Sequence, residues 1–331
     1  MINFRFSNLH TYIFMKNLLL SLLVICVLSF VTAIFFIPAK ITFSKVIILK
    51  TKIDIANRFL MDENRWGKWF PSDSFKNSSD SSNKKTTYKY QDYFYSIEKK
   101  MMNVAEVSIS NNKISLNSLI KIISINSDSI AIEWKSNMPV TINPYNRIRN
   151  YIKARKLRDN MSDILTHLKT FLEKNDNVYG IHLHVIISKD STLVATKCIT
   201  TSYPSTPDIY NLIGNLRKYI NLKDAKENNY PMLHVKKVND TTFETMVAIP
   251  VNKDLNGNGK IFNKRFVPWK VLTAEVKGGN YTVNEALDQM AIYINDYQIK
   301  AMAIPFASLV TDRSEQPDTL QWITRIYTPV P

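Results

Sequence analysis

The chain has 331 residues, which is long enough for two domains of ordinary size. Its hydrophobic fraction of 45% and charged fraction of 21% exclude a disordered, collagen-like or polytopic membrane protein. Only 7 glycines are present and no Gly-rich phosphate-binding motif occurs, which argues against a nucleotide-binding enzyme. The net charge of +15 favours an anionic partner: nucleic acid, anionic lipid or an acidic ligand.

The first segment with a clear pattern is an uncharged apolar run from Leu18 to Ile37, with Lys16 before it and Lys40 after it. At ~1.5 Å per residue this run is long enough to cross a bilayer. It predicts a transmembrane helix over about 17–38, within an N-terminal region of residues 1–40. A cleaved signal peptide is the alternative. We therefore expect a single-pass protein of a bacterial inner membrane, with the side of its remaining domains left open.

The next region alternates apolar and polar residues, as antiparallel strands do. A strand is expected over 43–49, a short helix over 53–61 and a polar loop over 72–87. Four strands follow over 88–97, 101–110, 113–123 and 129–135. A long helix then carries an apolar face with 3.6-residue spacing from Ile148 to Leu172.

The segment Asn64-Arg65-Trp66-Gly67-Lys68-Trp69-Phe70-Pro71 follows the first strand and short helix. It is similar to the N-x-W-x-x-W-x-P signature of START-like (SRPBCC, polyketide-cyclase-like) domains, and the resemblance covers residues 41–176. It implies a helix-grip fold with a cavity between the long helix and a curved sheet. Trp66 and Trp69 are the cavity candidates, and packing of the two rings in the core is the favoured interpretation.

The long helix begins with a basic run from Arg147 to Arg158. No groove-reading module accompanies this run, so we expect no nucleic-acid partner. Contact with anionic membrane lipid is one interpretation of the run, and a solvated helix face is the other.

From Val178 onward the pattern changes to strand, helix, strand, strand, and it does so twice. The repeats are expected over about 190–252 and 266–331, offset by roughly 79 residues. Ala248-Ile249-Pro250-Val251 in the first corresponds to Tyr327-Thr328-Pro329-Val330 in the second. Because neither repeat could bury its sheet face alone, the two are expected side by side in one domain over 177–331.

The duplicated βαββ pattern, the Gly279-Asn280-Tyr281 segment and the terminal Ile326-Tyr327-Thr328-Pro329-Val330 resemble the GyrI-like effector-binding domain. The resemblance implies a small-molecule cleft between the repeats, lined by aromatic side chains. The candidate ligand-binding residues are Tyr203, Tyr230, Tyr281, Phe306, Trp322 and Tyr327. Arg325 occupies a position that is usually acidic in that family, which would favour an anionic ligand over a cationic one.

Two other segments resemble metal-binding patterns only in part. His182 and His184 alternate on one predicted strand, but no third ligand has suitable spacing for zinc. Asp254 to Arg265 matches only the first part of an EF-hand loop, and a polar turn between the repeats is the better interpretation. We therefore expect no metal and no cofactor.

The sequence as a whole predicts an α+β protein with a START-like and a GyrI-like domain. Its predicted function is membrane-anchored binding or sensing of a small apolar or amphipathic molecule. A hydrolase-type enzyme is the alternative, with Glu275 or Glu244 as its general base. A structural protein whose pockets are filled by its own side chains is the third possibility.

Overall fold

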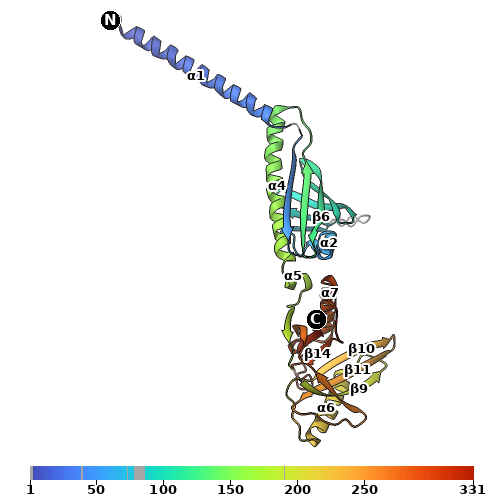
Figure 1. The fold of residues 1–331 in the computed structure, drawn as a ribbon. Helices are drawn as coiled ribbons and strands as arrows, with labels where there is room; N and C mark the ends of the chain where they lie inside the picture. The colour runs from blue at the N-terminus through green and yellow to red at the C-terminus, as the bar shows by residue number, and fades with distance from the viewer. Residues whose placement is uncertain (1–2, 39, 73, 78–85, 190) are drawn as a thin grey trace. The chain divides into compact units, whose positions relative to one another are not determined.

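The computed structural model describes residues 3–38, 40–72, 74–77, 86–189 and 191–331 (Figure 1). It is a mixed α+β protein built on two antiparallel sheets. The chain divides into two compact units, one ending at Glu173 and the other covering Lys174–Pro331. The first is called unit 1 and the second unit 2.

The chain begins with helix α1 (Asn3–Phe36). Crossing a bilayer takes roughly 20 consecutive, mostly apolar residues. Within the described residues, no helix combines sufficient length with sufficient apolar character to do so. This finding contradicts the predicted transmembrane anchor over Leu18 to Ile37 and the inner-membrane localisation inferred from it.

Unit 1 is a seven-stranded antiparallel sheet in the order β1-β7-β6-β5-β4-β3-β2, with helix α4 running along β1 (Figure 1). Helix α4 buries one apolar stripe against the sheet, which includes Leu157, Met161 and Ile164. The elements of unit 1 after α1 are β1 (Thr42–Leu49), α2 (Ile53–Leu60), α3 (Glu63–Trp66), β2 (Ser74–Asn77), β3 (Thr86–Tyr90), β4 (Tyr93–Met101), β5 (Val104–Asn111), β6 (Ile114–Asn126), β7 (Ser129–Asn137) and α4 (Pro144–Leu172).

The polar segment expected to be a loop over 72–87 contains a strand instead. Strand β2 pairs with β3, with Phe75 opposite Tyr88. A single aromatic residue among polar neighbours gives too weak an alternation to be recognised as a strand from the sequence. Residues 73 and 78–85 of this segment lie outside the described residues.

Unit 2 is an eight-stranded antiparallel sheet in the order β12-β9-β11-β10-β14-β15-β13-β8. Its elements are α5 (Asn175–Tyr179), β8 (His184–Ile187), β9 (Ser191–Thr200), α6 (Thr206–Leu222), β10 (Met232–Asn239), β11 (Thr242–Val251), β12 (Ile261–Phe266), β13 (Lys270–Lys277), α7 (Asn280–Asp296), β14 (Phe306–Leu309), a 3₁₀ turn η1 (Thr319–Gln321) and β15 (Ile323–Pro329).

The strand order of unit 2 places two similar halves side by side in one sheet, in mirrored strand order. The first half is β9-α6-β10-β11 and the second is β13-α7-β14-β15. In each half the first strand is outermost, the last strand is central and the second strand is innermost. The two innermost strands pair through Met232 opposite Ser308 and Leu233 opposite Ala307. These two register pairs join the halves into one continuous sheet.

Each half covers the same face of the sheet with its helix. Helix α6 begins with a capping box in which Ser205 and Asp208 satisfy each other's backbone N–H groups. Its apolar side chains pack on the strands of the first half; the buried ones are Ile209, Ile213, Leu216 and Ile220, as their 3.6-residue spacing predicts. Helix α7 buries Val283, Ala286 and Met290, and the Met290 sulfur accepts a hydrogen bond from Thr328.

The segment expected to be a polar turn between the repeats includes an edge strand. Strand β12 pairs with β9, with Lys264 opposite Leu193 and Phe266 opposite Ser191. Its polar middle, Asn263-Lys264-Arg265, hides the strand pattern in the sequence. Strand β12 matters because it supplies one wall of the pocket described below.

The start of α7 depends on Gly278, which has φ of +134° and donates its N–H to the Trp322 carbonyl at 2.8 Å. A Cβ at Gly278 would lie 2.6 Å from the Thr282 hydroxyl oxygen. We therefore expect Gly278→Ala to lower the free energy of unfolding by about 1–3 kcal/mol. Urea denaturation of the full chain measures it.

Gly214→Ala is the matched control, because Gly214 lies inside α6 and a Cβ there meets open space. This substitution is expected to raise the free energy of unfolding by about 0.5–1 kcal/mol. Equal effects of the two substitutions would show that Gly278 has no special conformational role.

Candidate functional site

The candidate site is a pocket on the face of the unit 2 sheet opposite α6, and it exists because that sheet is strongly curled. The rings of Phe266 on β12 and Phe306 on β14 lie 5.5 Å apart, although these strands are four positions apart in the sheet. In a flat sheet they would be separated by about 19 Å, at about 4.8 Å per strand. The curl therefore brings the edge of the first half over the innermost strand of the second.

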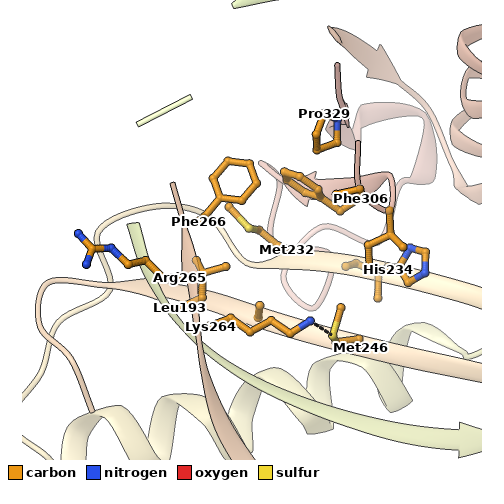
Figure 2. A pocket seen from close by; sticks show the side chains of 13 residues that line it. Leu193, Met232, His234, Met246, Lys264, Arg265, Phe266, Phe306 and Pro329 are labelled. Carbon is orange, nitrogen blue, oxygen red and sulfur yellow. Dashed lines mark hydrogen bonds between the residues drawn. The ribbon is translucent and has the colours of Figure 1, made fainter. Parts of the chain in front are cut away.

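The pocket has a volume of about 180 Å³ (Figure 2). Its lining is mainly apolar: Leu193, Met232, Leu233, Met246, Ala248, Phe266, Ala303, Ile304, Phe306 and Pro329, together with His234, Lys264 and Arg265. Pockets for drug-sized ligands are usually larger, at roughly 300–1,000 Å³. The pocket therefore suits a small molecule or one part of a larger one.

Strand register explains why these side chains meet. Met232 lies opposite Ala248, and His234 lies opposite Met246. Because side chains alternate along a strand, these four project from the same face of the sheet. Their neighbours Val247 and Ile249 project from the other face and belong to the core beneath α6. One face of β10 and β11 thus builds the core while the other builds the pocket.

The polar groups at the pocket are basic or neutral, and none of the described side chains that line it is acidic. The Lys264 ammonium lies 3.4 Å from the Met246 sulfur (Figure 2). The same ammonium lies over the Phe262 ring, 5.7 Å from its centroid. His234 Nδ1 lies 2.7 Å from the Pro305 carbonyl oxygen. A carbonyl can only accept, so Nδ1 carries the proton and Nε2 is left for another contact.

Two of the predicted ligand-binding residues lie at this pocket or beside it. Phe306 lines it, and its ring stacks on Tyr327 at 5.1 Å with an interplanar angle of 18°. These residues are register partners on β14 and β15. The aromatic side of the pocket is therefore formed by Phe266 and Phe306, and Tyr327 stacks on Phe306 without lining the pocket itself.

The other predicted aromatic residues lie elsewhere. Tyr203 lines a separate pocket on the helix-bearing side of the sheet. Trp322 does not line that pocket, but its ring lies 4.6 Å from the guanidinium carbon of Arg313, which does. Tyr230 is 42% exposed and Tyr281 is 81% exposed. The structure therefore does not gather all six residues around one cleft.

The charged residues that the sequence analysis selected, Arg325, Glu275 and Glu244, all form ion pairs in the structure. Arg325 on β15 lies opposite Glu275 on β13, and Arg325 Nε donates to the Glu275 carboxylate at 2.9 Å. This pairing raises the pKa of Arg325, chiefly through the hydrogen bond to Glu275. Glu244 accepts from Lys197 at 3.3 Å. Neither carboxylate is among the described residues that line the pocket.

The two tryptophans of the START-like segment are packed inside unit 1. Trp66 donates its indole N–H to the Leu60 carbonyl at 2.8 Å, and Trp69 donates to the Phe59 carbonyl at 3.2 Å. Trp66 also stacks on Phe70 with ring centroids 5.4 Å apart. Both side chains are buried and their polar atoms are satisfied, which fits the packing interpretation of this pair.

Two predicted surface clusters have simple partners in the structure. His182 Nδ1 lies 2.9 Å from an Asp176 carboxylate oxygen, beside the His184 ring. Across the described part of the chain, no group of three or more His, Cys, Asp and Glu side chains is placed to hold a metal ion. In the basic run, Lys156 forms an ion pair with Asp92. Lipid contact by that run stays a prediction.

Most pocket residues were not recognised in the sequence. They come from distant segments, and Met232, Met246, Lys264 and Phe266 carry no motif of their own. The usable sequence signal is the alternation along β10 and β11, which places Met232, His234, Met246 and Ala248 on one face. The structure shows that this face is the one opposite α6.

No protein-family model and no curated protein matches the chain. Solved structures with some similarity include a complex of EcmrR with DNA, SAV2435 bound to tetraphenylphosphonium, and a hydrolase from Listeria innocua. The EcmrR–DNA complex is 16% identical, with 56% of this chain and 71% of that chain covered and a TM-score of 0.42. SAV2435 is 17% identical, with 46% and 94% covered and a TM-score of 0.31. The Listeria innocua hydrolase is 8% identical, with 45% and 91% covered and a TM-score of 0.34. TM-scores below 0.5 at such identities assign neither a family nor an activity to this chain.

The Glu275–Arg325 pair is expected to contribute little, because both side chains are about half exposed. Glu275→Gln should change the free energy of unfolding by no more than about 1 kcal/mol and leave the binding of an apolar anionic probe such as anilinonaphthalene sulfonate unchanged. Urea denaturation and ligand titration of the variant measure both. A complete loss of binding in Glu275→Gln would instead place this carboxylate at the site.

Proposed function

We propose that the protein is a small-molecule binding or sensing protein, and that the pocket on the curled sheet of unit 2 takes a small apolar or amphipathic ligand. The observation that carries the proposal is an open, mainly apolar pocket of about 180 Å³ whose polar rim is basic. An apolar body would lie on Met232, Met246 and Phe306. A negatively charged or polar end would lie toward Lys264, Arg265 and His234.

The same observation favours binding over the two other possibilities. A structural protein with filled pockets would leave no such volume between the strands. An enzyme using Glu275 or Glu244 would need that carboxylate within reach of the ligand. Both carboxylates are instead engaged in ion pairs with Arg325 and Lys197.

We extend the proposal to the two family resemblances and their boundaries, with a START-like domain over 41–176 and a GyrI-like domain over 177–331. Support for the first comes from the antiparallel sheet covered by α4 and from the buried pair Trp66 and Trp69. Support for the second comes from two strand-helix-strand-strand halves that meet through β10 and β14.

Filling the pocket should abolish binding. Ala248 is a small residue of the lining, on the central strand β11, so Ala248→Phe places a ring in the space that a ligand would occupy. Fluorescence titration of the full chain with anilinonaphthalene sulfonate is the measurement. The variant is expected to bind this probe at least roughly tenfold more weakly than the unmodified chain, a difference of about 1.4 kcal/mol.

Ala301→Phe is the matched control, because Ala301 is exposed and does not belong to the lining. Its affinity for the probe should equal that of the unmodified chain. If Ala248→Phe also binds normally, while circular dichroism shows that it is folded, the pocket on the sheet is not the binding site.

A further inference from the structure

Unit 2 contains a second pocket, of about 100 Å³, on the side of the sheet that bears the helices. Its apolar lining includes Leu233, Val235, Val283 and Leu287. Its polar lining includes Tyr203, Asn280, Asn284 and Arg313. Arg313 is the unusual member, because it is only 5% exposed.

The Arg313 guanidinium has neutral neighbours where a carboxylate would be expected. Its Nη1 donates to Asn280 Oδ1 at 2.8 Å and its Nη2 donates to Thr324 Oγ1 at 2.8 Å. Its Cζ lies 4.6 Å from the centroid of the Trp322 ring. Among the described residues no carboxylate pairs with Arg313, and its Nε, which is buried, has no hydrogen-bond partner. A buried charge is normally paired, because removing it from water costs several kcal/mol.

The surroundings of Arg313 are arranged so that its position is fixed. The Tyr210 hydroxyl on α6 accepts the Arg313 backbone N–H at 2.6 Å. Trp322, beneath the guanidinium, donates its indole N–H to the Gln316 carbonyl at 2.8 Å. Burial lowers the pKa of Arg313, while the same burial raises the pKa of the Tyr203 hydroxyl that lines the pocket with it. Helix α6 thus holds the Arg313 backbone through Tyr210, helix α7 holds its guanidinium through Asn280, and no carboxylate among the described residues pairs with it.

The first turn of α7 adds to the positive character of the same pocket. Asn280, Val283 and Asn284 from this turn line it. The N-cap residue is Gly279, which has no side chain to satisfy the first N–H groups, and the first turn has no acidic residue. By contrast, the corresponding helix α6 is capped by Ser205 and Asp208. An uncapped helix start favours a negative group nearby.

We propose that this pocket binds a small carboxylate, whose charged group is held by Arg313 and whose short apolar part lies against Leu233, Val283 and Leu287. A planar carboxylate matches the fork of guanidinium N–H groups. The site is distinct from the pocket on the sheet, because Arg313 lines only the second and Ala248 only the first. Leu233, His234 and Phe306 belong to both linings, so the two sites are neighbours across the same strands.

Sodium benzoate is the probe, titrated into the full chain by calorimetry at constant ionic strength. The unmodified chain is expected to bind it saturably, and Arg313→Gln is expected to bind it at least roughly tenfold more weakly, since hydrogen bonds to charged groups are the strong ones. Arg313→Lys, which keeps the charge but loses the fork, is expected to fall between them. Arg65→Gln removes an equal charge from a partly exposed position in unit 1, where Arg65 pairs with Asp62, and this variant should bind as the unmodified chain does.

Asn280→Asp provides a test that does not depend on removing Arg313. It places a carboxylate of nearly the same shape on the atom that already accepts from Nη1 at 2.8 Å. This internal anion is expected to raise the melting temperature and to weaken benzoate binding by at least roughly tenfold. A purely structural role for Arg313 would raise the melting temperature in this variant without changing benzoate affinity.

The outcomes separate the two sites. Benzoate binding that survives in Ala248→Phe and is lost in Arg313→Gln supports the second site. If Ala248→Phe loses benzoate binding while Arg313→Gln and Asn280→Asp bind benzoate normally, the proposed second site is overturned and the anion binds in the pocket on the sheet. Tight binding of inorganic phosphate with no binding of benzoate would overturn the carboxylate class, and no saturable binding of either would overturn the site.

Discussion

The short pairing of β10 with β14 is the contact on which unit 2 depends. Two register pairs, Met232 with Ser308 and Leu233 with Ala307, turn two similar halves into one eight-stranded sheet. Without them the first half would expose the edge of β10 and the second half the edge of β14 to solvent, and natural sheets avoid such unpaired edges. Both pockets lie beside this pairing, one on each face, and both include Leu233, His234 and Phe306. The halves therefore have to meet correctly before either pocket exists.

The basic residues of the chain differ in burial and in pairing, and therefore in how much each could contribute to stability or binding. Arg325, Lys156 and Arg217 are exposed or partly exposed, and each has a carboxylate partner, so each contributes little beyond solubility. Arg313, by contrast, is buried, and its guanidinium is held among neutral groups. A net charge of +15 could not distinguish these cases, because burial and pairing, rather than the number of basic residues, decide what a cation can bind.

The sequence predicted the parts of unit 2 that depend on local periodicity. The apolar face of α6 and the order of strands and helices within each half follow from residue spacing. Strand β12 was missed because its middle is polar and its partner β9 lies far away in sequence. The pairing of Arg325 with Glu275 could not be foreseen either, since cross-strand register is not a local property. Arg313 lies outside regular structure, where no pattern indicates burial.

The two methionines of the pocket on the sheet bear on how selective that pocket can be. Met232 and Met246 are unbranched and carry polarizable sulfur atoms, so they can change rotamer to fit apolar groups of different outline at little cost. The aromatic rings are by contrast restrained by one another: Phe306 meets Phe266 edge to face at 5.5 Å and stacks on Tyr327 at 5.1 Å. The methionine part of the pocket is therefore adaptable and the aromatic part is rigid. For the proposed ligand, this construction suits a group of related compounds with different apolar outlines better than a single compound.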